Sequence, residues 1–108
     1  MISKEILDKY RMLSLEELKA EFGDSAETEI WFYREFLNQT DHIPNKISER
    51  FVKGLSETTL SNFIGVYIGI VKDIKNEYKD ILDCRQFARD EINRLLNIGG
   101  EADGNSTE

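Results

Sequence analysis

The chain has 108 residues, including 14 Lys or Arg and 21 Asp or Glu, so its formal net charge is -7. Hydrophobic residues make up 40% of the chain, which is enough to order one small core but not two. The acidic balance argues against direct binding to nucleic acid or to an anionic membrane, because both require clustered basic side chains. A single cysteine excludes an intramolecular disulfide framework and is typical of a reducing compartment.

No segment of the sequence predicts membrane targeting. The first residues, MISKEILDKYRML, are charged and lack the apolar stretch of a signal peptide. The most apolar window, FIGVYIGIV at 63–71, is far shorter than the stretch of about 20 residues that a membrane-spanning helix needs. We therefore expect a soluble, cytoplasmic protein.

Helix signals dominate the first quarter of the chain. Ser3 is placed to cap a short first helix. Ser14 and Glu17 have the spacing of a capping box, in which each side chain accepts a hydrogen bond from the backbone N–H of the other residue. Gly23 is expected to end the second helix, because glycine readily adopts the left-handed conformation that closes helices. We expect Asp24 to begin the third helix.

Two further helices are predicted before residue 55. Apolar residues at helical spacing continue the third helix as far as Leu37. Thr40 or Asp41 is expected to cap the fourth helix, and Pro44 is acceptable only in its first turn, where a missing N–H costs nothing. Gly54 is expected to end this helix.

From residue 56 onward, apolar residues form one nearly continuous helical stripe as far as residue 96. This pattern fits a single helix of about 40 residues or two helices, and we favour two, with a tight joint near Lys75-Asn76. Residues 64–70 also alternate as a strand would, but a lone strand would leave its backbone hydrogen-bonding groups unpaired, so a helix is preferred. Gly99-Gly100 is expected to end the last helix.

Together these elements predict an all-α fold, a small single-domain helical bundle with a long C-terminal helical hairpin. The domain is expected to span residues 1–98, and residues 99–108 are expected to form a disordered acidic tail. The aromatic residues expected in the core are Trp31, Phe32, Phe36, Phe63, Tyr67 and Phe87.

No arrangement of side chains predicts catalysis. His42 and Cys84 alone cannot build a zinc site, so we interpret His42 as a polar residue at a helix start and Cys84 as a small buried hydrophobe. Asp73, Glu77 and Asp80 share one helical face, but the lysines interleaved with them are typical of a solvated face with i,i+4 ion pairs. We expect no enzymatic activity, no catalytic residues, no metal and no cofactor.

Gly65 and Gly69 have the spacing at which small residues let helices approach closely. One interpretation is tight packing inside the monomer, which we favour because the chain has little other core. The alternative is a dimer seam flanked by Tyr67 and Ile68, which would make the protein a homodimer.

The distribution of charge is the most informative feature of the sequence. Between residues 16 and 29 the only basic side chain is Lys19, among six acidic ones. Helix N-termini explain some of these carboxylates. The others would present a local negative field able to dock in a basic groove built for phosphates. The residues expected to bind a partner in this way are Glu16, Glu17, Glu21, Asp24, Glu27 and Glu29.

Two stretches resemble a paired pattern in small helical proteins of bacteriophages and prophages of Gram-positive bacteria, LNQTDHIPNKISE at 37–49 and YKDILDCRQFARDEINRL at 78–95. The matched positions are Thr40, Asp41, Ile43, Pro44, Lys46, Ile47, Glu49, Tyr78, Leu82, Arg85, Gln86, Arg89, Asp90, Glu91, Ile92 and Asn93. The resemblance implies a helical-hairpin scaffold and a mobile-element origin, and it carries no catalytic residue over. The chain departs from the pattern at residues 50–77, where the pattern usually has a short turn, and in the acidic segment that comes first.

A small, acidic, helical phage protein is similar to the class that includes anti-CRISPR inhibitors. The function this implies is that of a non-enzymatic phage or prophage protein that inhibits a host defence nuclease by blocking a nucleic-acid-binding surface of a Cas effector in the bacterial cytoplasm. The alternative is a structural accessory protein of the phage particle, such as a tail or baseplate component or a packaging chaperone. It would oligomerise through the apolar 63–71 face and the 85–93 helix.

Overall fold

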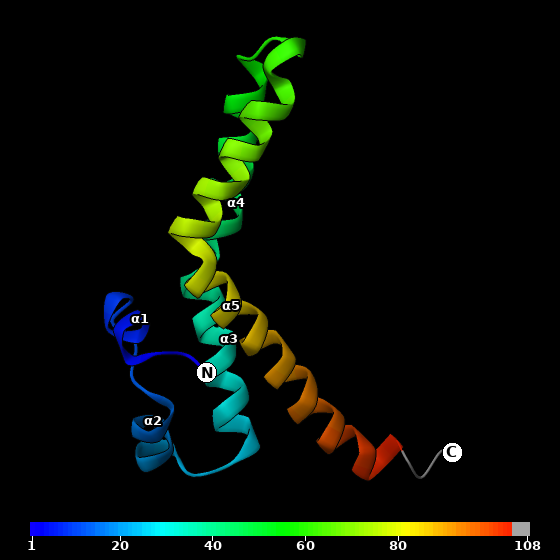
Figure 1. The fold of residues 1–108 in the computed structure, drawn as a ribbon. Helices are drawn as coiled ribbons and strands as arrows, with labels where there is room; N and C mark the ends of the chain where they lie inside the picture. Colours follow the sequence, from blue (N-terminus) through cyan, green and yellow to red (C-terminus); the bar gives the residue numbers. More distant parts are fainter. Residues whose placement is uncertain (105–108) are drawn as a thin grey trace.

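Residues 1–104 of the chain, described here from a computed structural model with side chains for residues 1–98, are helical apart from their termini and connections (Figure 1). The elements are α1 (Lys4–Lys9), α2 (Leu15–Phe22), α3 (Ala26–Gln39), α4 (His42–Ser56), the 3-10 turn η1 (Leu60–Asn62) and α5 (Phe63–Gly104). The predicted all-α class is confirmed. Of the tail expected to be disordered, residues 105–108 lie outside the described residues, and α5 extends past the expected end at Gly99-Gly100.

The helices form an elongated molecule. Helices α3 and α4 follow one another in the same general direction, α5 returns along both, and α1 and α2 lie to one side of α3 (Figure 1). The radius of gyration is 18.6 Å, whereas a compact chain of this length would have about 13 Å. The extra length comes from α4 and the first half of α5, which project as a two-helix arm, and from the second half of α5, which diverges from α3 (Figure 1).

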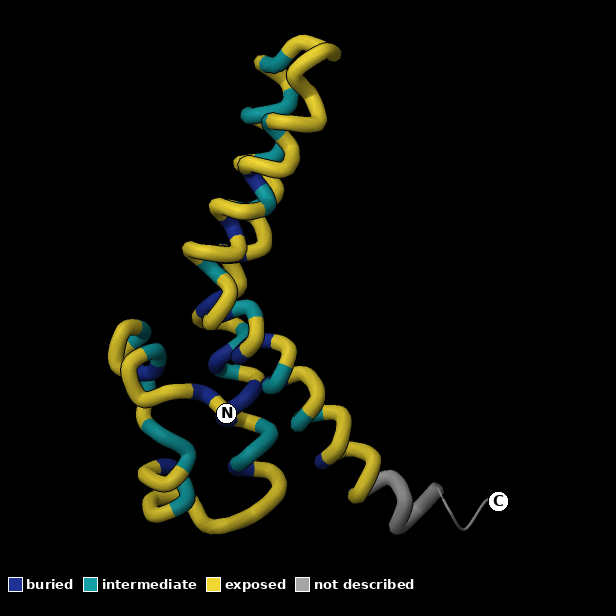
Figure 2. Tube along the Cα trace, in the orientation of Figure 1, coloured by how far each residue is buried: buried dark blue, intermediate teal, exposed yellow. Residues whose placement is uncertain are grey.

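The core lies where α1, α2, α3 and the middle of α5 meet, and Figure 2 shows few buried positions along the arm. Its buried residues are Ile2, Leu7, Leu18, Phe32, Tyr33, Phe36, Ile43, Ile81, Cys84, Ala88 and Leu95. Of the expected aromatic core, Phe32 and Phe36 are buried and Phe87 is partly buried against them. The prediction was wrong for the other three aromatic residues, Trp31, Phe63 and Tyr67, which are 54%, 41% and 46% exposed.

Helix α5 is continuous, so the favoured joint near Lys75-Asn76 was wrong. The helix changes direction near its middle but is not interrupted (Figure 1). Its buried stripe passes through the expected joint, with Ile70 and Ile74 before it and Ile81 after it. The hairpin is therefore formed by α4 and α5, and the preference for a helix over a strand at residues 64–70 is confirmed.

The close approach between the two helices of the arm is at Gly54. A Cβ at this position would lie 2.6 Å from Cδ1 of Ile70, and α4 continues past it to Ser56, so its expected role as a helix end was wrong. A Cβ added at Gly65 or Gly69 would meet no atom of another helix within 4 Å among the described residues. The favoured interpretation of these two glycines, tight packing inside the monomer, was therefore also wrong.

A buried arginine joins the end of α3 to α5. Arg85 donates hydrogen bonds from Nη1 to the backbone oxygen of Leu37, at 2.9 Å, and to Oγ1 of Thr40. Thr40 is fully buried and in turn donates from Oγ1 to the backbone oxygen of Phe36, at 2.8 Å. The positive charge thus lies at the C-terminus of α3, where the helix dipole and free carbonyl groups favour a cation. Burial lowers the pKa of Arg85 below its usual value, and the nearby charge of Arg89 lowers it further.

The end of α1 is a helix-closing turn built without glycine. The backbone N–H of Met12 donates to the oxygen of Leu7, and that of Arg11 donates to the oxygen of Asp8. This pair of bonds is the Schellman pattern, which places its penultimate residue in the left-handed region. Arg11 is that residue, with φ at 55°, and no sequence signal predicted it.

Candidate protein-binding surface

The acidic segment begins with a capping box that uses one of its six carboxylates. Oε1 of Glu17 accepts the backbone N–H of Ser14 at 3.1 Å, and Oγ of Ser14 accepts the N–H of Glu17 at 3.2 Å. The bond from the Ser14 backbone N–H to the carboxylate, and then the nearby Ser14 side chain, stabilise the charged form and lower the pKa of Glu17. The predicted capping box is confirmed, and the Glu17 carboxylate caps the N-terminus of α2.

Between α2 and α3, a lysine engages two more carboxylates. Nζ of Lys19 lies 3.2 Å from Asp24 and 2.7 Å from Glu29. These contacts, that of Glu29 first, raise the pKa of Lys19. Glu29 also lies 4.0 Å from Arg94 of α5, so this cluster links α2, α3 and α5.

The start of α3 is one residue later than expected. Gly23 closes α2 with φ at 104°, as predicted. Ser25, rather than Asp24, caps α3, because its Oγ accepts the backbone N–H of Thr28 at 3.3 Å. Asp24 therefore lies in the connection, where its exposed carboxylate reaches Lys19.

Glu16, Glu21 and Glu27 are exposed and form no ion pair within the described residues. They do not share one face, because at 100° per residue Glu16 and Glu21 point about 140° apart around α2. The six predicted residues are thus divided between internal contacts and separate surfaces.

Two exposed aromatic residues lie beside the unpaired carboxylate of Glu27. Phe22, 69% exposed, and Trp31, 54% exposed, line a shallow, mostly apolar pocket together with Glu27 and Thr28. Glu21 precedes Phe22 at the end of α2. We call the surface formed by Phe22, Glu27 and Trp31 the acidic–aromatic corner; Glu21 adjoins it in the last turn of α2. It offers an apolar contact with carboxylates beside it, which is suited to a basic partner.

Sequence reasoning placed Trp31 in the core and missed its part in this surface. A signal was present, because residues at i-4, i+3 and i+7 from Trp31 share its side of α3. These residues are Glu27, Arg34 and Asn38, all exposed, whereas the buried side carries Thr28, Phe32 and Phe36.

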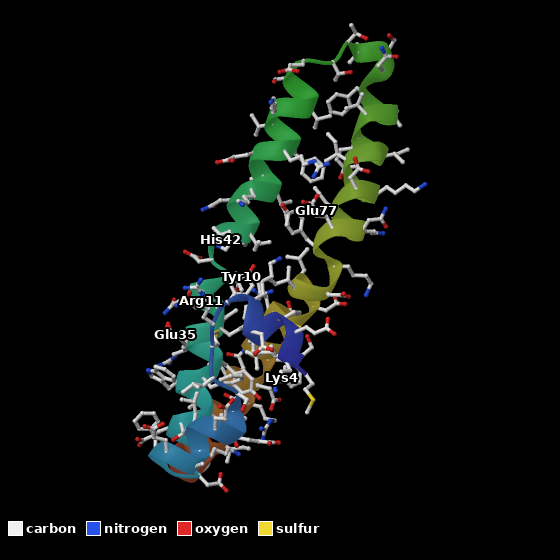
Figure 3. All side chains as sticks on the ribbon, turned by 90° about the vertical axis from the view of Figure 1, so that its left-hand side faces the viewer. Lys4, Tyr10, Arg11, Glu35, His42 and Glu77 are labelled. Carbon is white, nitrogen blue, oxygen red and sulfur yellow. The ribbon has the colours of Figure 1, made fainter. Side chains whose placement is uncertain are left out.

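The other residues considered for chemistry have structural contacts. His42 is the first residue of α4, and its ring lies 6.1 Å from that of Tyr10 (Figure 3). Cys84 is buried, as predicted, with Sγ 3.7 Å from the backbone oxygen of Met1. Asp73 and Glu77 lie 3.5 and 2.7 Å from Arg50 of α4, in exposed ion pairs that join the two helices of the arm.

Within the described part of the chain, no group of three or more His, Cys, Asp or Glu side chains is arranged to hold a metal ion. Over the same residues, no helix combines the length and the apolar character needed to cross a membrane. Comparison of the chain with protein families, with curated proteins and with solved structures finds no match.

Proposed function

We propose that this protein is a non-enzymatic binding protein whose acidic–aromatic corner covers a basic surface of a partner protein. The observation that carries this proposal is the exposure of Trp31 and Phe22 beside Glu27. Tryptophan is prominent among the residues that dominate binding energy at interfaces. Carboxylates beside it select a partner with Lys or Arg at the matching positions and speed the encounter.

The partner we propose is a nucleic-acid-binding surface of a host defence nuclease, specifically a Cas effector. This narrower identity comes from the resemblance to phage and prophage proteins, and a phage or prophage origin is part of the proposal. A surface that binds phosphates carries clustered Lys and Arg. These side chains would also form ion pairs with the carboxylates of Glu21 and Glu27. Binding there would exclude the nucleic acid without any chemical step.

The proposal is tested by measuring DNA cleavage by purified Cas effectors of Gram-positive hosts with and without the protein. Inhibition should be lost when Glu21→Lys and Glu27→Lys are combined, and also in Trp31→Ala. The matched control combines Glu49→Lys and Glu57→Lys, exposed residues of α4 and its C-terminal end that give the same change in net charge. Inhibition retained by the folded corner variants, or lost equally in the control, would contradict the proposal.

A second function, as a self-associating accessory of the phage particle, is favoured by the exposed apolar residues of the arm. Ile64 and Ile68 are 73% and 59% exposed. The 85–93 helix expected to share this role is less available, because Arg85 and Ala88 are buried within the chain. Self-association would therefore use the arm.

A further inference from the structure

The arm formed by α4 and the first half of α5 has a second apolar face that no helix covers within the described part of the chain. Toward α4, α5 presents Ile70 and Ile74, which are buried. A different side of the same helix carries the exposed Ile64 and Ile68 and a shallow hollow lined by Tyr67, Ile68, Val71, Lys72 and Lys75. Figures 1 and 2 show this part of α5 beside α4 alone, well away from α1 and α2.

This second face has the spacing of a coiled coil. Its positions follow one another at intervals of four, three and four residues, namely Ile64, Ile68, Val71 and Lys75. The next two positions of the series, Tyr78 and Leu82, pack against the core of the chain and are not part of this face. Such alternation keeps one stripe facing a partner helix, and a single lysine in it fixes register at a cost in stability. The residues of α5 that pack on α4 lie on a different side of the helix, so the contact with α4 does not explain this second stripe. Its spacing is that of a contact with another helix.

We infer that the partner is a second copy of this chain, with the two α5 helices antiparallel across the exposed face. In this register Ile68 of each copy lies opposite Val71 of the other, and Ile64 lies opposite the aliphatic stem of Lys75, whose ammonium group reaches solvent. A parallel pairing would instead bring Lys72 and Lys75 of one copy beside the same residues of the other. The antiparallel arrangement separates these like charges, so the charge pattern selects it.

The exposed apolar residues of the arm suit a weak dimer. Leu60, in the turn just before this face, is 92% exposed, and Tyr67 is 46% exposed. With Ile64 and Ile68, which are 73% and 59% exposed, these residues supply an apolar contact at the small, weakly associating end of the range of specific interfaces. The inference is independent of the acidic–aromatic corner, which lies at the far end of the molecule from the tip of the arm.

Sedimentation velocity of the full chain tests the dimer. The wild type should sediment at twice the monomer mass of 12.5 kDa at concentrations of about 10–100 μM. Ile68→Asp should weaken association at least about a hundredfold. The matched control is Val52→Asp, which places the same charge at a residue that is 69% exposed on α4, and it should remain a dimer.

A monomeric wild type across this range, or equal loss of association in both variants, would overturn the inference. Circular dichroism at low concentration establishes that Ile68→Asp keeps its helices. Nuclease inhibition by this variant should be unchanged, so failure of the dimer and failure of the proposed function are distinguishable.

Spin labels test the direction of pairing. A label at Ser61→Cys, in a Cys84→Ser background, should be offset from its copy by about 25 Å along the antiparallel pair, at 1.5 Å per residue. A parallel pair would place the two labels near the interhelical distance of about 10 Å. A dominant short distance would overturn the antiparallel arrangement.

Discussion

Replacing Thr40 by valine should destabilise the protein substantially without changing its shape. Valine has nearly the same shape as threonine but lacks the hydroxyl that accepts from Arg85 and donates to the oxygen of Phe36. Thr40 is fully buried and Arg85 is 8% exposed, so water cannot replace the lost bond. A hydrogen bond to a charged group contributes about 1.5–3 kcal/mol, and Arg85 keeps its bond to Leu37. We therefore expect a loss of about 2 kcal/mol.

Urea unfolding at neutral pH, followed by circular dichroism, measures this loss as a lower midpoint with an unchanged slope. The control is Thr59→Val, at an exposed threonine before η1, which should change the free energy of unfolding by less than about 0.5 kcal/mol. A double-mutant cycle with Arg85→Met should give a coupling of about 1–3 kcal/mol. A change at Thr40 as small as the control's, or no coupling, would refute the reasoning.

Four further predictions use the same unfolding assay. Ser14→Ala should cost about 1 kcal/mol by removing the cap of α2. Because the folded pKa of Glu17 is lowered, its contribution is present above the unfolded pKa of about 4.3 and is lost as pH falls through the folded pKa. The stability difference between wild type and Glu17→Gln should therefore shrink on acidification, and a constant difference would contradict this. Arg11→Gly should stabilise the protein by about 0.5–1 kcal/mol, since its φ is positive. The change in the free energy of unfolding caused by Gly54→Ala should be more favourable in an Ile70→Val background than in the wild type, by about 0.5 kcal/mol or more. The reason is that valine lacks the Cδ1 atom that the added Cβ would meet.

Local sequence signals predicted the helix starts better than the helix ends. Ser3 and Ser14 cap α1 and α2 as expected, because a cap depends on residues within one turn of each other. Gly54 was expected to end α4, yet it lies within the helix, where its missing side chain leaves the space that Ile70 of α5 occupies. That contact joins two helices, and no local pattern contains it.

The candidate surface was predicted less well than the fold. Composition located the acidic segment, but the pairing of Asp24 and Glu29 with Lys19 depends on the angle between α2 and α3. Aromatic residues were assigned to the core by their hydrophobicity, although Tyr67 projects from a two-helix arm that cannot bury both of its faces. The buried role of Arg85 was also missed, because its hydrogen-bond partners lie 45 and 48 residues away in the sequence.

The central claim is that the acidic–aromatic corner binds a basic, nucleic-acid-binding partner, and comparative affinity capture from a phage-carrying Gram-positive host tests it most directly. Three baits are compared by mass spectrometry under washes of increasing salt: the wild type, the variant combining Glu21→Lys with Glu27→Lys, and the control combining Glu49→Lys with Glu57→Lys. We predict a nucleic-acid-binding effector on the wild type and the control that is released by salt and absent from the corner variant. The same proteins on all three baits, or only virion proteins held at high salt, would contradict the claim.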